Sequence, residues 1–197
     1  MNDLKKLSYS LGLNIAKNLQ SQGVEELDAK VLSEAVADVF AGGDLKIGVE
    51  DSAIFLNEHF GKLAAKKHEA VIQQGKDFLE ANSKREGVVT LGSGLQYEIM
   101  NEGSGEKPTI SSTVTTHYHG TTIDGTVFDS SVQRGQPASF PVNGVIAGWT
   151  EALQLMPVGS KWKLFVPSNL AYGERGAGPQ IGPHTTLIFE VELLEIK

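Results

Sequence analysis

Few side chains of this sequence have the types and spacing that covalent or metal chemistry requires. Cysteine is absent, which excludes disulfides, thiol nucleophiles and thiolate metal sites. No G-x-S-x-G or G-K-[ST] sequence occurs, so neither a serine nucleophile elbow nor a phosphate-binding loop is predicted. His117 and His119 lie two residues apart, but no third ligand stands at a recognisable spacing, and two ligands do not make a zinc site. We expect no metal and no cofactor.

The remaining candidates for chemistry are aromatic and aliphatic residues beside loops. They are Tyr118, Phe128 with the adjacent Asp129, Val145, Ile146, Trp149, Tyr172 and Phe189. Each one alone could be a core residue, and Phe189 lies in an alternating pattern that must bury one face. As a set they predict an apolar pocket with a few polar groups, which is the usual composition of a small-ligand site.

The charge and hydropathy of the chain argue against several classes of partner. Lysine and arginine number 17 against 24 acidic residues, a formal net charge of −7 at pH 7, which disfavours binding to a phosphate backbone. No window approaches the run of about 20 apolar residues that spans a bilayer, and the first residues lack the apolar core of a signal peptide. We expect no nucleic-acid or membrane partner and a cytoplasmic location, or a periplasmic one if a signal peptide has been removed.

Strand-like segments dominate the chain after residue 87. Glycines become frequent there, and six of the seven prolines follow residue 130. The segments with strand composition are 95–100, 113–118, 161–166 and 187–196, and one helical pattern covers 146–156. Strands with a single helix predict a small antiparallel α+β domain over residues 88–197, in which the helix covers one face of a curved sheet.

Helical periodicity dominates the chain before residue 88. Apolar residues recur at helical spacing over residues 4–19, and Gly23 is a plausible stop. A second helix is predicted between an Asp28 cap and Gly42. A third runs from about residue 50 to residue 86 without a proline. Its apolar positions thin out in the second half, so we expect its first part to be buried and its second part to stand in water.

The apolar faces of the first two helices have no partner within their own segment. Isolated helices gain little stability from propensity alone, and two-fold dimers are the commonest oligomers. We therefore predict a homodimer, with residues 1–48 as a helical dimerisation region and residues 49–87 as a long stalk helix. Gly12 and Ala16 lie four residues apart and would permit two helices to cross closely; a tolerated helix glycine explains Gly12 equally well.

Five segments, in order along the second half of the chain, resemble the macrolide-binding (FKBP) family of peptidyl-prolyl cis/trans isomerases. They are Gly125–Ser131, Val145–Trp149, Leu155–Gly159, Ala171–Gly173 and Pro183–Leu194. Residues 9–19 are similar to the opening helix of the Mip-type bacterial members. The resemblance implies a curved antiparallel sheet wrapped on one short helix, carried on an N-terminal helical arm that forms a V-shaped dimer.

The resemblance also implies roles for individual residues. Trp149 forms the floor of the pocket, the Ile146 N–H and the Tyr172 hydroxyl donate to substrate carbonyls, and Asp129 polarises the substrate from the rim. Together these four are the expected catalytic set. The residues expected to bind the substrate around them are Tyr118, Phe128, Val145, Ile181 and Phe189. Isomerisation breaks no bond, so this pocket needs no nucleophile, metal or cofactor.

The expected partners are unfolded or proline-containing polypeptides, and macrolide inhibitors are further candidates. Ala138, Ala177 and Gly182 stand where the commonest eukaryotic pattern has an aromatic residue, a histidine and a proline, and these departures bear on macrolide affinity. Two other functions stay open. One is a non-enzymatic chaperone that holds unfolded chains between the two domains of a dimer, and the other is a catalytically silent docking domain.

Overall fold

The computed structural model describes residues 1–197. Contacts divide the chain into two units, Met1–Lys67 and His68–Lys197, and helix α3 (Val49–Ser83) contributes residues to both. No helix combines the length and the apolar character that crossing a membrane requires. The expected division at residues 48 and 87 stays a prediction.

The N-terminal unit consists of α1 (Asp3–Ser21), α2 (Ala29–Ala41) and the first part of α3. Asp28 caps α2, because its carboxylate accepts from the N–H groups of Lys30 and Val31 at 3.0 Å each. Gly42 ends the same helix in the left-handed conformation, with φ of 64°. The two short helices thus begin and end close to the residues that the sequence predicts.

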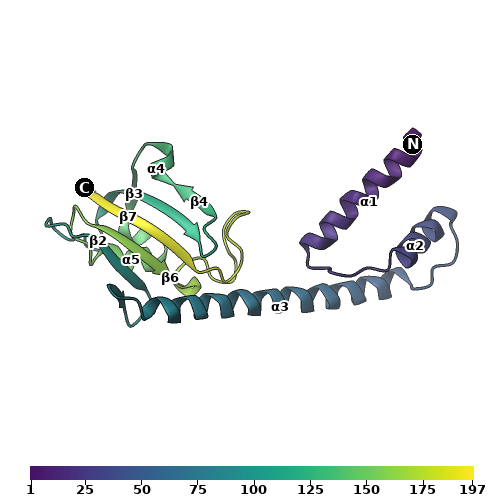
Figure 1. Cartoon of the computed structure of the whole chain (residues 1–197), viewed down its shortest axis with the longest axis horizontal. Coiled ribbons are helices and arrows are strands. Elements are labelled where there is room, and N and C mark those ends of the chain that lie inside the picture. The colour runs from purple at the N-terminus through teal and green to yellow at the C-terminus, as the bar shows by residue number, and fades with distance from the viewer. The chain divides into compact units, whose positions relative to one another are not determined.

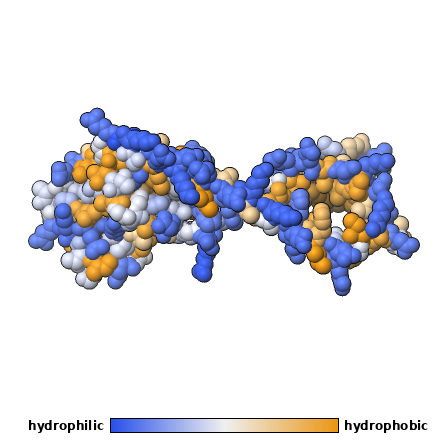
Figure 2. Space-filling model, turned by 90° about the horizontal axis from the view of Figure 1, so that it is seen from below, coloured by the Kyte–Doolittle hydropathy of each residue, from blue (hydrophilic) through white to orange (hydrophobic).

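The apolar faces of this unit are uncovered in the single chain. No residue of α1 or α2 is buried, and Phe40 is 89% exposed. Figure 2 shows apolar side chains gathered on the surface of this unit. In α3, Val49 and Phe55 are 72% and 65% exposed. The first part of α3 is therefore not buried within the chain, contrary to the interpretation from the sequence.

The second part of α3 packs within the C-terminal unit. Asn82 is 3% exposed and donates to Gln96 Oε1 at 2.8 Å. Gln96 donates in turn to the Leu79 carbonyl at 2.9 Å, and the ring of Phe78 lies 6.0 Å from that of Phe165. The expectation that this part stands in water was wrong, because amide side chains, which read as surface residues, make much of the contact.

The C-terminal unit is built on a seven-stranded antiparallel sheet with the order β1-β2-β6-β7-β3-β4, in which β5 pairs with β3 (Figure 1). The strands are β1 (Val88–Thr90), β2 (Gln96–Asn101), β3 (Thr113–Thr122), β4 (Val127–Ser130), β5 (Ala138–Pro141), β6 (Lys161–Val166) and β7 (Leu187–Ile196). The sequence predicts β6 and β7 with these bounds. It misses β1, β4 and β5, which are too short to show an alternating pattern.

Helix α5 (Ala147–Leu153) covers one face of the sheet and supplies Trp149, Ala152 and Leu153 to the core. The facing residues of β7 are Leu187, Phe189, Val191 and Leu193, all at most 4% exposed. This confirms the predicted α+β fold and the alternation of the last strand. A second helix, α4 (Ser131–Arg134), was not predicted, because four residues are too few to show helical periodicity. Two 3₁₀ turns, η1 (Val142–Gly144) and η2 (Ser168–Leu170), complete the unit.

Candidate active site

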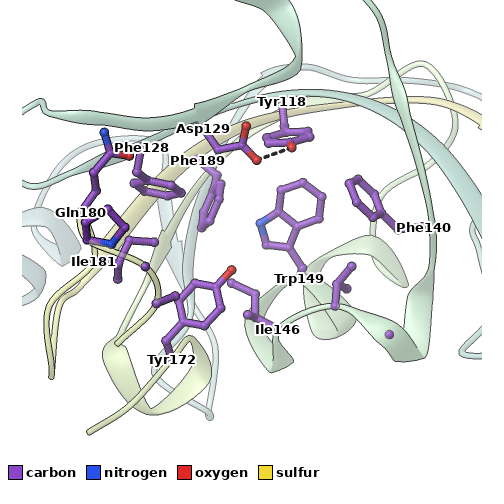
Figure 3. A pocket seen from close by; sticks show the side chains of 15 residues that line it. Tyr118, Phe128, Asp129, Phe140, Ile146, Trp149, Tyr172, Gln180, Ile181 and Phe189 are labelled. Atoms are coloured by element: carbon purple, nitrogen blue, oxygen red, sulfur yellow. Dashed lines mark hydrogen bonds between the residues drawn. The ribbon is translucent and has the colours of Figure 1, made fainter. Parts of the chain in front are cut away.

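A pocket of about 720 Å³ opens between the sheet, α5 and the loop that precedes β7. All nine residues expected from the sequence line it (Figure 3). The lining residues are Tyr118, Phe128, Asp129, Phe140, Gly144, Val145, Ile146, Trp149, Tyr172, Ala177, Gly178, Pro179, Gln180, Ile181 and Phe189. The fold thus brings together residues that lie up to 71 positions apart in the chain, from Tyr118 to Phe189.

The floor and walls of the pocket are aromatic rings that meet edge to face. The Trp149 ring lies 5.4 Å from that of Tyr118 and 5.3 Å from that of Phe189, at interplanar angles of 83° and 79°. Phe128 meets Phe189 at 5.4 Å, and Phe140 meets Trp149 at 6.0 Å. Edge-to-face contacts are the favoured geometry of aromatic pairs. The network therefore holds each ring of the pocket in place.

Two glycines allow these rings to approach. A Cβ on Gly120 of β3 would lie 2.6 Å from the Phe128 ring and 3.0 Å from the Phe189 ring. A Cβ on Gly148 of α5 would lie 2.6 Å from the Val166 side chain in β6. Glycine at these positions lets the aromatic walls close and lets α5 lie against the sheet. The position of the Trp149 floor thus depends on a small residue beside it.

Asp129 at the rim is held by two hydrogen-bond donors. The Tyr118 hydroxyl donates to Asp129 Oδ2 at 2.5 Å, and the Arg134 guanidinium forms an ion pair with Oδ1. Arg134 also donates to the Tyr118 hydroxyl at 2.8 Å, and its Cζ lies 5.6 Å from the centre of the Tyr118 ring. The sequence gave no signal for Arg134, because the short α4 that places it beside Asp129 has no visible period.

The three groups shift one another's protonation. Burial alone would raise the pKa of the Asp129 carboxyl, but the hydrogen bonds from Tyr118 and Arg134 and the guanidinium charge outweigh it and hold the pKa below its usual value. Burial raises the pKa of the Tyr118 hydroxyl, and the bond to Asp129 adds to this effect. At neutral pH the rim therefore carries an ionised carboxylate beside a neutral phenol.

Hydrogen-bond donors without a partner in the chain remain at the pocket. Trp149 Nε1 is buried and unpartnered. The Ile146 N–H, just before α5, makes no backbone hydrogen bond. The Tyr172 side chain is 40% exposed and lies across the pocket from Asp129 and Tyr118 (Figure 3). An apolar cavity with a few free donors can hold a carbonyl-bearing ligand while excluding water.

The loop before β7 adds lining residues that the sequence analysis did not single out, among them Pro179 and Gln180. Ala177 and Ile181 exchange two backbone hydrogen bonds, of 2.8 and 3.2 Å, which close the loop. Ala177 and the retained Phe140 line the pocket, whereas Ala138 pairs with Thr116 in the sheet. A loop without periodicity gives no sequence signal for which of its residues face a ligand.

Comparison with known proteins defines the class. Residues 104–194 match the family described as FKBP-type peptidyl-prolyl cis-trans isomerase, and residues 4–99 match the family described as the domain amino terminal to FKBP-type peptidyl-prolyl isomerase. The chain belongs to the FKBP-type peptidyl-prolyl cis-trans isomerases, and it is an enzyme of this type.

The similarity extends along nearly the whole chain. The chain is 48% identical to an FKBP-type 22 kDa peptidyl-prolyl cis-trans isomerase of Escherichia coli K12, over 96% of this chain and 93% of the relative. It is 46% identical to the outer membrane protein MIP of Legionella longbeachae, over 99% and 86%. The crystal structure of FkpA from Escherichia coli superposes with a TM-score of 0.79 at 38% identity, over 100% of this chain and 97% of that one.

Proposed function

We propose that the 720 Å³ pocket is the site of isomerisation, with Asp129, Tyr172, Ile146 and Trp149 as its catalytic residues. The observation that carries the proposal is the combination of closed aromatic walls, unpartnered donors and a fixed carboxylate around one cavity. FKBP-type isomerases act on proline-containing polypeptides. The prolyl ring of the substrate would lie on Trp149, between Tyr118 and Phe189.

The chemistry asked of this pocket is a bond rotation. Amide resonance gives the X–Pro bond a barrier of about 18–20 kcal/mol, so that uncatalysed isomerisation takes tens of seconds or more. Water that hydrogen-bonds to the imide carbonyl stabilises the planar, resonant form. Apolar walls exclude that water, and donors that bind the other carbonyls of the substrate can hold the flanking backbone in the twisted geometry. The Ile146 N–H and the Tyr172 hydroxyl are the donors we assign to this role.

The rim carboxylate acts on the polarity of the carbonyl. As the C–N bond twists, nitrogen donates less electron density and the carbonyl carbon becomes more electron-poor. The ionised Asp129, held by Tyr118 and Arg134, presents a negative charge that is already oriented before the reaction. Preorganised charges of this kind stabilise a transition state without a cost of reorganisation.

A peptide isomerisation assay tests the catalytic assignment. We expect Trp149→Ala and Asp129→Ala each to lower kcat/KM for cis-to-trans conversion by at least about tenfold, which corresponds to about 1.4 kcal/mol of transition-state stabilisation. Asp77→Asn, on the exposed face of α3 outside the pocket, is the control and should keep full activity. Unchanged rates in the first two variants would contradict the pocket assignment.

We also propose that macrolides bind in the same pocket, through the aromatic walls that Phe140 completes beside Trp149. Ala177, a small residue on the loop, gives less contact than a larger side chain would. Because it would occupy the same pocket as the substrate, a macrolide should inhibit peptide isomerisation competitively. Inhibition with no change in apparent KM would place the macrolide elsewhere.

We propose that residues 1–67 make the protein a homodimer. Leu4, Leu7 and Phe40 are 70%, 58% and 89% exposed in the single chain, and apolar surface gathers on this unit (Figure 2). Exposed apolar patches of this kind usually mark an interface. Solution mass should show a dimer for the full chain and a monomer for residues 68–197. A monomeric full chain would overturn the proposal.

A dimer would carry two pockets, and we propose that together they hold unfolded chains in the manner of a chaperone. Two linked sites bind one long chain more strongly than either does alone. The second part of α3 does not add to this argument, because it packs within the C-terminal unit. The catalytically silent docking domain that the sequence left open is disfavoured, because relatives that are similar over nearly the whole chain are named as isomerases.

We propose that the protein is located in the cytoplasm, with the periplasm as the alternative. One relative is titled an outer membrane protein, which favours the alternative. Cell fractionation, with detection of the protein by an antibody, tests the assignment. Detection in the periplasmic fraction would overturn the cytoplasmic assignment.

A further inference from the structure

A second, smaller cavity of about 230 Å³ lies in the C-terminal unit. Three segments form its walls. The second part of α3 supplies Val71 and Gln74, the end of β3 and the turn after it supply Thr122, Ile123, Asp124 and Thr126, and the loop before β7 supplies Gln180, Thr185 and Thr186. None of the proposed catalytic residues lines it. We refer to it as the α3 pocket.

The α3 pocket and the active-site pocket share one wall. Gln180 lines both cavities. Figure 3 places Gln180 at one end of the active-site pocket, beyond Phe128 and Ile181 and on the opposite side from Phe140. An extended chain that crosses Trp149 and leaves at this end therefore reaches the α3 pocket next.

The chemistry of the α3 pocket is polar, with one charge. Its lining carries the hydroxyls of four threonines and the amides of Gln74 and Gln180, and Asp124 is the only ionisable side chain among the residues that form it. The Asp124 Oδ1 atom accepts from the Thr122 hydroxyl and from the Thr126 N–H. The Oδ2 atom makes no hydrogen bond within the chain. These bonds hold the pKa of Asp124 below its usual value, so its free oxygen carries negative charge at neutral pH.

We propose that the α3 pocket binds the stretch of substrate polypeptide that flanks the prolyl bond, and that Asp124 selects a lysine or arginine in this stretch. The proposal rests on the assignment of isomerisation to the neighbouring pocket. Primary amides such as those of Gln74 and Gln180 can both donate to and accept from the backbone of an extended chain. A cationic side chain is the natural partner of an isolated carboxylate oxygen.

Helix α3 belongs to this subsite because it packs closely against the loop before β7. A Cβ on Gly75 would lie 2.6 Å from Thr186 Oγ1, so glycine allows the helix backbone to approach the loop before β7. This approach sets Val71 and Gln74 of α3 against Thr186 at the cavity. The subsite thus needs residues before 88, whereas the active-site pocket is lined by later residues alone.

Peptide series with an internal reference test the proposal on the full chain. Every peptide carries one X–Pro bond and either lysine or glutamate two to four residues from it. In one series this residue lies on the N-terminal side of the bond, and in the other it lies on the C-terminal side. A short peptide without the extension gives the reference rate. In one of the two series we expect kcat/KM for the lysine peptide to exceed that for the glutamate peptide by about twofold to fivefold, the range of an exposed ion pair. High salt should reduce the ratio.

Matched variants show where the preference arises. Asp124→Asn keeps an oxygen that can accept from Thr122 and Thr126, and it should bring the lysine-to-glutamate ratio close to one. Asp77→Asn makes the same change of net charge outside the cavity and should leave the ratio unchanged. Gln74→Lys should reverse the preference, whereas Gln73→Lys, one residue along α3 and outside the cavity, should not.

The outcomes separate this proposal from the one on which it rests. A ratio near one in both series, or a preference that survives Asp124→Asn, would overturn the α3 subsite while the reference rate still supports the active site. A reference rate that Trp149→Ala leaves unchanged would overturn the active-site assignment instead.

Discussion

The contacts of Asp129 show how much of this site depends on single residues. Its carboxylate is shared between the Tyr118 hydroxyl and the Arg134 guanidinium. Tyr118 is 7% exposed, so the phenol is fixed by packing as well as by its hydrogen bonds. The orientation of the rim charge is therefore set by a residue from β3 and a residue from α4, neither of which has to touch the reacting bond.

Arg134 contributes, after the hydrogen bond from Tyr118, to the lowered pKa of Asp129. Since Asp129 has a lowered pKa, activity that needs the ionised carboxylate is present at neutral pH and is lost as the pH falls through the pKa of the folded protein. Arg134→Ala removes one cause of the lowering, so the acid limb of the kcat/KM profile should move to higher pH.

The pH profile of isomerisation measures this shift. Arg134→Lys keeps the positive charge, so its acid limb should lie between those of the wild type and Arg134→Ala. The lowered pKa of Asp129 also means that its ion pair and hydrogen bonds stabilise the fold at neutral pH. This contribution to the free energy of unfolding should be lost as the pH falls through the pKa of the folded protein. An acid limb at the same pH in wild type and Arg134→Ala would show that the guanidinium does not act through Asp129.

At this scale the residues expected from the sequence gather around one cavity, and their roles there stay a prediction. All nine expected residues line the cavity. Seven of them lie in the motifs that resemble the family, whereas Tyr118 and Ile181 lie outside those motifs. Arg134 and Gln180 were not predicted. Their positions depend on a four-residue helix and an aperiodic loop, and neither structure leaves a period in the sequence.

At the scale of elements, the second part of α3 is the main revision of the sequence-based picture. Its contacts to the sheet include hydrogen bonds from Asn82 to Gln96 and from Gln96 to the Leu79 carbonyl. Just after the helix, Arg85 pairs with Glu98 at 2.9 Å. Hydrophobic periodicity detects apolar faces and not interfaces of this composition. Residues 68–87 therefore have to be included in any domain that is meant to reproduce the catalytic unit.

The close approach at Gly75 predicts a contrast between two glycines of one helix. Alanine favours a helix over glycine by about 1 kcal/mol, but at Gly75 a Cβ would meet Thr186 Oγ1 at 2.6 Å. We expect Gly75→Ala to destabilise the C-terminal unit by about 1–3 kcal/mol. Gly61→Ala, where nothing lies within 4 Å of the added Cβ, should not destabilise it.

Tryptophan fluorescence during denaturant unfolding measures this contrast, because both tryptophans, Trp149 and Trp162, lie in the C-terminal unit. The midpoint for Gly75→Ala should fall, while the midpoint for Gly61→Ala should not. Equal midpoints for the two variants would show that α3 does not pack closely against Thr186.

At the scale of the whole molecule, the two units divide the work. Residues 68–197 contain every residue that lines the active-site pocket and the α3 pocket. Residues 1–67 have no buried side chain and expose apolar helix faces, which a single chain leaves uncovered. The first unit would thus link two chains and raise their avidity for unfolded substrates, and the second unit would perform the isomerisation.

The most direct test compares the full chain with residues 68–197 on two substrates. On a short proline peptide, the two proteins should have the same kcat/KM within about twofold. On an unfolded protein whose refolding is limited by a prolyl bond, residues 68–197 should be slower by at least about tenfold, because linked binding sites raise avidity by about 100-fold or more when both engage. This division would be contradicted if residues 68–197 were inactive on the peptide. It would also be contradicted if the full chain and residues 68–197 had equal rates on the unfolded protein.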